Sequence, residues 1–190
     1  MVDHVGQQLG NYRLTRLLGH GGFAEVYLGE HLHLGTQAAI KVLNVQLAGV
    51  ELARFRDEAR IIARLQHPHI VRILDFGVDG ALPFCAMDYA PNGTLRQHYR
   101  GNIPLPATSI LPHVKQVASA LQYAHEQKVI HRDIKPENML LGRHNEVLLS
   151  DFGIAVVMQS SRSKLVEETA GTVAYMAPEQ IQAQPGPASD

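Results

Sequence analysis

The hydrophobic pattern of this chain changes once, near the turn Pro91-Asn92-Gly93, and that change limits the possible folds more than any other feature. Before the turn, short apolar runs separated by glycines are typical of β-strands, and one segment has helical spacing instead. After the turn, an apolar stripe from Ile110 to Ala124 repeats at helical intervals. Strands followed by helices predict an α+β fold.

The expected strands lie at Tyr12 to Leu18, Glu25 to Gly29, Ala38 to Leu43, Ile70 to Phe76 and Pro83 to Tyr89. The first two flank a glycine cluster and predict a hairpin. A helix is expected from Glu51 to the His67-Pro68 pair, and its inner face carries Phe55, Ile62 and Leu65. The second helix carries the stripe Ile110, Val114, Val117, Leu121 and Ala124. We expect two lobes, 1–89 and 90–190, with a ligand site between them.

Composition narrows the functional classes. The 190 residues are 45% hydrophobic, which suits one domain or two small lobes. Seventeen basic and 18 acidic residues give a net charge of −1 and no electrostatic basis for binding nucleic acid or an anionic membrane. The chain shows neither a secretory signal nor an apolar run of about 18 residues. The single cysteine, Cys85, excludes an internal disulfide. We therefore expect a cytoplasmic location, or the cytoplasmic face of a membrane-anchored parent.

A glycine-rich segment joins the first two expected strands: Gly19-His20-Gly21-Gly22-Phe23-Ala24-Glu25-Val26. Glycines there let backbone N–H groups approach phosphates with no Cβ in the way. No Gly-Lys-Ser/Thr follows, so the segment is not a P-loop. Because a strand rather than a helix follows, a dinucleotide-binding fold is disfavoured as well. A plain flexible hairpin is the alternative.

Two charged residues interrupt apolar patterns in the first lobe. Lys41 lies within the apolar strand Ala38 to Leu43, where a buried ammonium group needs an anionic partner. Glu58 shares a helical face with Phe55 and Ile62, so it points inward and is available to pair with Lys41. The alternatives are a solvent-facing lysine and a glutamate at the rim of the helix stripe.

The most specific motif is His131-Arg132-Asp133-Ile134-Lys135-Pro136-Glu137-Asn138. Its aspartate, the lysine two residues on and the asparagine five residues on can converge from one loop. They would supply a proton acceptor, a cation for a moving phosphoryl group and a metal ligand. Two shorter motifs follow, Asp151-Phe152-Gly153 after the apolar strand Val147 to Leu149, and Ala177-Pro178-Glu179 after Gly171 to Met176.

Taken in order, these six features resemble the eukaryotic-type, or Hanks-type, protein kinase family, in its bacterial serine/threonine branch, from about Leu9 to Asp190. The resemblance implies a bilobal fold with a β-rich small lobe containing one helix and a mainly helical large lobe. The family's catalytic domain runs on beyond the segment that Pro187 to Asp190 resembles, the start of the central large-lobe helix. We therefore expect a C-terminally incomplete large lobe, with Asp190 anchoring the catalytic loop, the segment that carries the motif His131 to Asn138.

The resemblance also assigns catalytic roles. Lys41, oriented by Glu58, would hold the α and β phosphates of ATP. Asp133 would accept the substrate hydroxyl proton, and Lys135 would neutralise charge on the γ-phosphoryl group. The metal ligands would be Asn138 and Asp151, which would bind Mg²⁺ or Mn²⁺.

The ATP site follows from the same resemblance. Val26, Ala39 and Leu140 would sandwich the adenine, and Met87 would guard the back of the pocket, although ordinary core packing is an equal reading for Met87 and Leu140. Cys85 is expected in the core. The complete expected set is Gly19, His20, Gly21, Gly22, Phe23, Ala24, Val26, Ala39, Lys41, Met87, Asp88, Ala90 and Leu140. Ala24 takes the place of the family's third glycine, and Asp88 and Ala90 would offer hinge backbone groups.

Serine/threonine specificity is implied by Lys135 and by Thr172, which would bridge Asp133 and Lys135. Arg132 would bind a phosphate group carried by the activation loop, Asp151 to Glu179. Thr169 is the preferred site of that phosphorylation and Ser163 the second. The expected activity is transfer of the γ-phosphoryl group of Mg·ATP to Ser or Thr hydroxyls of proteins, including other copies of itself in trans. The alternative is a catalytically silent nucleotide-binding or interaction module. Intact catalytic residues favour the enzyme, and the expected missing helices favour the module.

Overall fold

The computed structural model describes residues 4–21, 24–44, 49–80, 82–99, 104–152, 174–182 and 184–190. The chain divides into two compact units, Met1–Ala59 with Arg72–Tyr89, and Arg60–Val71 with Ala90–Asp190. Residues 60–71, which the sequence pattern predicts to lie in the small lobe, group with the second unit. The amide of Val71 donates to the carbonyl of Leu149, and the amide of Leu149 donates to the carbonyl of His69, both at 2.9 Å.

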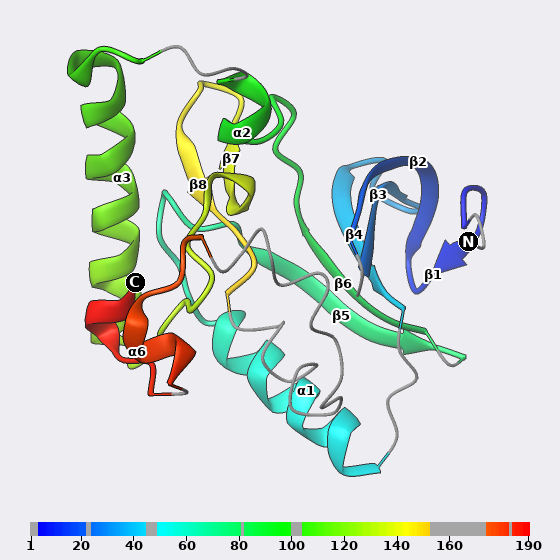
Figure 1. The fold of residues 1–190 in the computed structure, drawn as a ribbon. Helices are drawn as coiled ribbons and strands as arrows, with labels where there is room; N and C mark the ends of the chain where they lie inside the picture. Colours follow the sequence, from blue (N-terminus) through cyan, green and yellow to red (C-terminus); the bar gives the residue numbers. More distant parts are fainter. Residues whose placement is uncertain are drawn as a thin grey trace. The chain divides into compact units, whose positions relative to one another are not determined.

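A six-stranded antiparallel sheet, in the order β1-β2-β3-β4-β6-β5, forms most of the first unit (Figure 1). The strands are β1 (Gln8–Leu9), β2 (Tyr12–His20), β3 (Ala24–His31), β4 (Gln37–Leu43), β5 (Ile73–Asp79) and β6 (Leu82–Asp88). The expected glycine-centred hairpin is therefore present. Strand β1 was not predicted, because two residues are too few to show an alternating pattern.

Two elements, α1 (Gly49–Ile62) and β5, have boundaries that differ from the sequence prediction by three residues or more. Helix α1 ends before His67-Pro68, because the amides of Arg64 and Leu65 bond three residues back and form a turn rather than continuing the α-helix. Strand β5 begins three residues later than expected, because Ile70 forms an isolated parallel bridge with Leu149 instead.

Cross-strand register gives the sheet two distinct faces. Val26, Lys41 and Cys85 lie side by side across β3, β4 and β6, with Ala39 and Met87 in the next row of the same face. The opposite face carries an apolar core, whose members are Leu9, Tyr12, Leu14, Tyr27, Ala38, Ile40, Val42, Phe84 and Ala86. The residues predicted for nucleotide binding on β3, β4 and β6 therefore share the face that does not carry this core.

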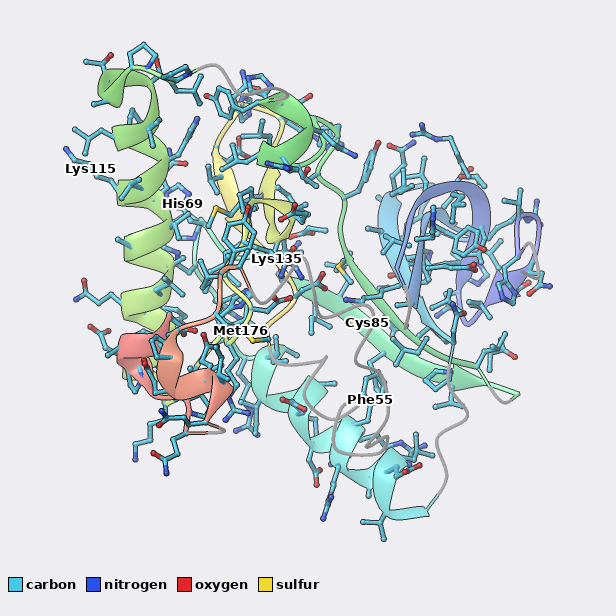
Figure 2. All side chains as sticks on the ribbon, viewed as in Figure 1. Phe55, His69, Cys85, Lys115, Lys135 and Met176 are labelled. Carbon is cyan, nitrogen blue, oxygen red and sulfur yellow. The ribbon has the colours of Figure 1, made fainter. Side chains whose placement is uncertain are left out.

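Helix α1 contacts the face that carries Lys41. The buried ring of Phe55 meets Phe76 edge-on, with ring centroids 4.9 Å apart, and Phe76 lies opposite Cys85 in the β5–β6 ladder (Figure 2). Cys85 is buried, as expected for a core residue.

Helices and 3₁₀ turns are the main regular elements that the structure describes in the second unit. Its elements are α2 (Leu95–His98), α3 (Ala107–Glu126), the 3₁₀ turn η1 (Pro136–Asn138), the hairpin β7 (Met139–Leu141) and β8 (Val147–Leu149), α6 (Pro178–Ile181) and the 3₁₀ turn η2 (Pro187–Ser189). Leu95, Leu141 and Val147 form its core cluster, and the side chain of Gln116 on α3 accepts the amide of Val147 at 2.7 Å. The hairpin is thereby attached to α3.

The apolar stripe on α3 is buried unevenly. Ala120 and Ala124 are fully buried, whereas Ile110 and Val114 are 38% and 53% exposed. No helix among the described residues combines the length and the apolar character needed to cross a bilayer.

Candidate active site

The loop between α3 and β7 brings three of the predicted catalytic residues together. The Asp133 carboxylate uses Oδ2 to accept Nζ of Lys135 and Nδ2 of Asn138, both at 2.9 Å. The same amide nitrogen of Asn138 donates to the backbone carbonyl of Asp133 at 2.8 Å. The side chain of Asp133 is thus fixed from two sides through a single oxygen.

The second carboxylate oxygen of Asp133 has a different environment. Oδ1 is buried and, among the described residues, has no hydrogen-bond partner. Leaving a buried acceptor unsatisfied costs about 1–3 kcal/mol, and more if it is charged, so such atoms in native structures call for an explanation. A substrate group that donates a hydrogen bond to Oδ1 would provide one.

Asp190 holds the backbone of the same loop. Its carboxylate accepts the amides of His131 and Arg132, each at 2.7 Å, and its side chain is completely buried. This is the anchoring contact expected from the sequence. A third partner was not expected: Nε2 of His125, near the end of α3, lies 2.9 Å from Oδ2. Arg132 has a φ of 70°, an uncommon angle for a residue with a side chain, and these contacts help to maintain it.

His131 connects the loop to the end of β8. Its buried ring donates from Nε2 to the carbonyl of Ser150 at 2.7 Å, accepts the amide of Asp133 at Nδ1 at 3.2 Å, and packs on Phe152. Burial lowers the pKa of His131, although the Ser150 carbonyl and the carboxylate of Asp190 act in the opposite direction. Because Nε2 faces a carbonyl and Nδ1 accepts an amide, these two hydrogen bonds fit the tautomer with its proton on Nε2.

The predicted metal ligands lie on two segments joined by Ser150. The amide of Ser150 donates to the Asn138 carbonyl at 2.9 Å, and Asp151 follows at a φ of 64°. Both side-chain hydrogen bonds of Asn138 are donated by Nδ2, so its amide oxygen is the atom suited to a cation. An amide oxygen and a carboxylate fit Mg²⁺, which typically takes one or two protein carboxylates together with phosphate oxygens and water.

Such a pair is sparse for a site made by protein alone. In the part of the chain that the structure describes, no group of three or more His, Cys, Asp or Glu side chains is gathered for a metal ion. One amide oxygen and one carboxylate would leave most positions of a six-coordinate Mg²⁺ to phosphate oxygens and water.

The predicted nucleotide residues of the first unit occupy β2, β3, β4 and β6. The amide of Gly21 donates to the carbonyl of Ala24 at 2.9 Å, while Gly19 and His20 pair with Val26 and Glu25. Ala39 and Met87 are buried, and Lys41 on β4 and Glu58 on α1 are both half-buried. Asp88, also half-buried, lies 3.4 Å from Arg72.

The remaining predicted residues fall in the second unit or outside the described residues. Ala90 is buried, and Leu140 is half-buried on β7. The Nε atom of Arg132 is buried and has no hydrogen-bond partner among the described residues. The residues outside the described ranges are Gly22, Phe23, Thr172, Ser163 and Thr169.

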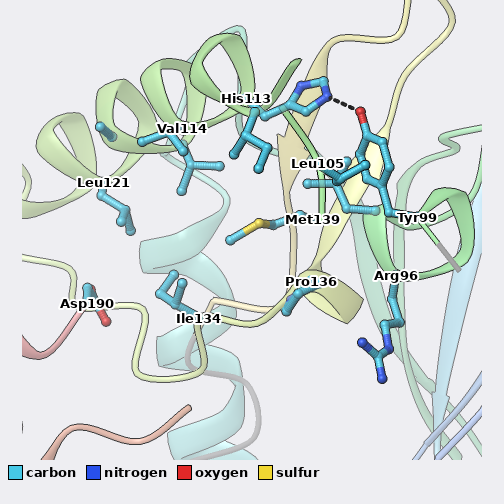
Figure 3. Close-up of a pocket in the computed structure, with 14 residues that line it drawn as sticks. Arg96, Tyr99, Leu105, His113, Val114, Leu121, Ile134, Pro136, Met139 and Asp190 are labelled. Atoms are coloured by element: carbon cyan, nitrogen blue, oxygen red, sulfur yellow. Dashed lines mark hydrogen bonds between the residues drawn. The ribbon is translucent and has the colours of Figure 1, made fainter. Parts of the chain in front are cut away.

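An apolar groove of about 480 Å³ lies on the other side of the catalytic loop, against α3 (Figure 3). Ile134 and Pro136 project into it, whereas their neighbours Asp133 and Lys135 pair with each other. The loop thus alternates between apolar residues that line the groove and polar residues that form the cluster. Ordinary packing of Ile134 and Pro136 helps to fix the polar residues next to them, Asp133 and Lys135.

Several contacts near the site were not predicted from the sequence. Tyr99 on α2 and His113 on α3 are joined at 3.0 Å between the hydroxyl and Nε2 (Figure 3), and Arg96 lies 3.7 Å from Glu137. His125 and Ser150 were also missed. One sequence signal was available for Ser150. A polar residue that lies directly between an apolar strand and a candidate metal ligand is in a position to orient that ligand by hydrogen bonding.

Comparison with known proteins places these features in one family. Residues 12–190 match the protein kinase domain family. The serine/threonine-protein kinase PrkC of Bacillus subtilis is 36% identical over 179 residues, covering 93% of this chain and 28% of PrkC. PknF of Mycobacterium tuberculosis is 40% identical over 189 residues, covering 93% of this chain and 39% of PknF. This chain therefore spans less than half the length of these curated relatives.

A solved structure of a kinase domain is also similar to this chain. A crystal structure of a mutant PknI kinase domain from Mycobacterium tuberculosis superimposes with a TM-score of 0.79 at 32% sequence identity. The match covers 100% of this chain and 72% of the PknI chain.

Proposed function

The chain belongs to the protein kinase domain family, among relatives that are bacterial serine/threonine kinases, and from this premise we propose that it transfers the γ-phosphoryl group of Mg·ATP to Ser or Thr hydroxyls of proteins. Members of this family generally use ATP and a divalent metal ion to phosphorylate proteins. The proposal extends this general activity to the named residues of this chain.

One observation carries the proposal, namely the unequal environment of the two Asp133 oxygens. Lys135 and Asn138 hold Oδ2, so the carboxylate cannot rotate freely, while Oδ1 is buried and has no hydrogen-bond partner among the described residues. We propose that the acceptor hydroxyl of the substrate donates to Oδ1, which orients it and receives its proton during transfer. Such a positioned base suits phosphoryl transfer, which depends mainly on geometry and charge.

The neighbours of Asp133 have complementary roles in this proposal. Lys135 neutralises charge on the γ-phosphoryl group, and the amide oxygen of Asn138 and the carboxylate of Asp151 hold the metal ion. Bound Mg²⁺ would offset the negative charge of the phosphates, and Mn²⁺ suits the same oxygen donors. The short bonds from Asn138 to Asp133 support a shared site, because the metal ligand and the base are fixed to each other.

For the first unit we propose nucleotide binding. Lys41, oriented by Glu58, holds the α and β phosphates, and the turn from Gly19 to Ala24 covers them. The position of Lys41 on the same sheet face as Ala39 and Met87 supports this assignment. The remaining adenine contacts in the proposal are Val26, Asp88, Ala90 and Leu140.

We also propose control by phosphorylation. Arg132 would bind a phosphate on Thr169 or Ser163, added in trans by another copy of the protein, while Thr172 would bridge Asp133 and Lys135. The buried Nε of Arg132, which has no partner among the described residues, supports this role for the guanidinium group. We place this activity in the cytoplasm or on the cytoplasmic face of a membrane. Cys85, the single cysteine of the sequence, is buried and cannot form an internal disulfide, which fits a reducing compartment.

The test is transfer of label from γ-labelled ATP to a generic basic protein, followed by identification of the phosphorylated amino acid. We expect phosphoserine or phosphothreonine that depends on Mg²⁺ and is abolished by a chelator. Nucleotide binding without any transfer would instead support the silent binding module. Transfer to tyrosine alone would refute the assigned specificity.

A further inference from the structure

Ser150 lies at the end of β8, immediately before the proposed metal ligand Asp151, and none of the roles assigned above uses its side chain. It is one of few buried polar residues in the described part of the chain, with 5% of its surface exposed. A buried hydroxyl is costly unless it is hydrogen-bonded, so its partner indicates its purpose.

That partner is the second proposed metal ligand. The Ser150 hydroxyl donates to the backbone carbonyl of Asn138 at 3.1 Å, and the Ser150 amide donates to the same oxygen at 2.9 Å. A carbonyl oxygen has two lone pairs and can accept both bonds. The hydroxyl therefore supplies the second hydrogen bond that this carbonyl can accept, and it restricts the backbone of Asn138 more than the amide would alone.

Ser150 is also held from the opposite side. Its own carbonyl accepts Nε2 of His131 at 2.7 Å. Both backbone polar groups of Ser150, the residue before Asp151, are therefore held by hydrogen bonds: its carbonyl by His131 and its amide by Asn138. This matters because Asp151 has a φ of 64°, a conformation that non-glycine residues keep only when their surroundings enforce it.

We infer that Ser150 is a positioning residue, whose hydroxyl sets the separation and orientation of Asn138 and Asp151 and so tunes the affinity for the metal ion. The inference rests on the proposed metal site. It concerns the hydroxyl group alone, because alanine at this position would keep both backbone hydrogen bonds and lose only the hydroxyl. Partners that orient metal ligands typically change metal affinity by 10- to 100-fold when removed, and one hydrogen bond accounts for roughly 2- to 10-fold.

The test measures metal binding directly, with Mn²⁺ as the probe. The Mn²⁺ dissociation constant is determined by electron paramagnetic resonance in the presence of ADP for the wild-type protein and three variants. We expect Ser150→Ala to weaken Mn²⁺ binding about 2- to 10-fold. Ser150→Thr, which keeps a hydroxyl, should stay within about twofold of the wild type. Ser119→Ala is the matched control, since it removes a hydroxyl from α3 in the same unit, where it pairs with His67.

A second readout separates positioning from general destabilisation. The Mg²⁺ concentration needed for half-maximal phosphoryl transfer should rise in Ser150→Ala, while the rate at saturating Mg²⁺ should fall by a smaller factor. A lower melting temperature with unchanged Mn²⁺ affinity would show a merely structural role and overturn the inference. Equal weakening in Ser150→Thr and Ser150→Ala would also overturn it.

The outcome for the wild-type protein distinguishes this inference from the proposed function. If the wild type binds Mn²⁺ with ADP and Ser150→Ala binds it equally well, only the role of Ser150 is refuted. If the wild type itself does not bind Mn²⁺ with ADP, the proposed metal site is refuted and the role of Ser150 is refuted with it.

Discussion

Removing the Asp190 carboxylate should destabilise the second unit and loosen the catalytic loop. In Asp190→Ala, the amides of His131 and Arg132 lose acceptors at 2.7 Å, and His125 loses its partner at 2.9 Å. A hydrogen bond to a charged group is worth about 1.5–3 kcal/mol, so two of them correspond to about 3–6 kcal/mol. Water entering the vacated space would reduce this loss toward about 2 kcal/mol.

This loss is large beside the total stability of a domain, which is about 5–15 kcal/mol. Asp190→Asn should lose about half as much, because its single amide oxygen can accept only one of the two amides well. The matched control is Asp79→Ala. The Asp79 carboxylate accepts one amide, that of Gly10, at 3.3 Å on the exposed surface of the first unit, and its loss should cost less than about 1 kcal/mol.

Two measurements test this prediction. Urea unfolding is followed by far-UV circular dichroism, because the chain contains no tryptophan to report by fluorescence. Hydrogen exchange then reports on the amides of His131 and Arg132 directly, and both should exchange faster in Asp190→Ala. An unfolding free energy within about 0.5 kcal/mol of the wild type, together with unchanged exchange at both amides, would refute the anchoring role.

Three other predictions address the metal site, the buried histidine and regulation. Asp151→Ala should abolish metal-dependent nucleotide binding, measured by titrating Mg²⁺ against a fluorescent ATP analogue, and an unchanged metal dependence would contradict the ligand assignment. Because burial lowers the pKa of His131, the unfolded state takes up its proton first as pH falls below about 6.5, so stability should decrease by up to about 1.4 kcal/mol per pH unit. Burial and His69 also lower the pKa of His67, so urea unfolding across that pH range is measured in a His67→Gln background. The slope of the unfolding free energy against pH should become smaller when His131→Asn is added. Mass spectrometry of active protein should find phosphate on Thr169 or Ser163, and full activity with both unmodified would refute the proposed regulation.

Much of the sheet could be predicted because its strands are short apolar runs separated by glycines and turn residues. Ala38 to Leu43 shows this well, since the apolar residues of both faces surround one lysine and the structure forms β4 at nearly the same bounds. The catalytic cluster could also be predicted, because Asp133, Lys135 and Asn138 lie within six residues and a single loop brings them together. Short-range chemistry of this kind is visible in sequence.

Long-range contacts could not be predicted in the same way. His125 and Asp190 are 65 residues apart, and nothing in either neighbourhood indicates that they pair. The contact of the Ser150 hydroxyl with the Asn138 carbonyl depends on how β8 aligns with the catalytic loop. The end of α1 was missed for a related reason, since Leu65 keeps the buried periodicity of the helix after the α-helical hydrogen bonds have stopped.

The most direct test of the proposed function is the effect of Asp133→Asn on transfer and on nucleotide binding, measured on the same preparation. Asparagine has nearly the same shape but is a much weaker proton acceptor, so it should act on the chemical step alone. We predict that transfer from γ-labelled ATP falls by at least about 100-fold while the affinity for Mg·ATP stays within about threefold. The control Asp79→Asn, on β5 in the first unit, should leave both unchanged. Near-normal transfer by Asp133→Asn would contradict the proposed function, because Oδ1 of Asp133 would then not be the proton acceptor.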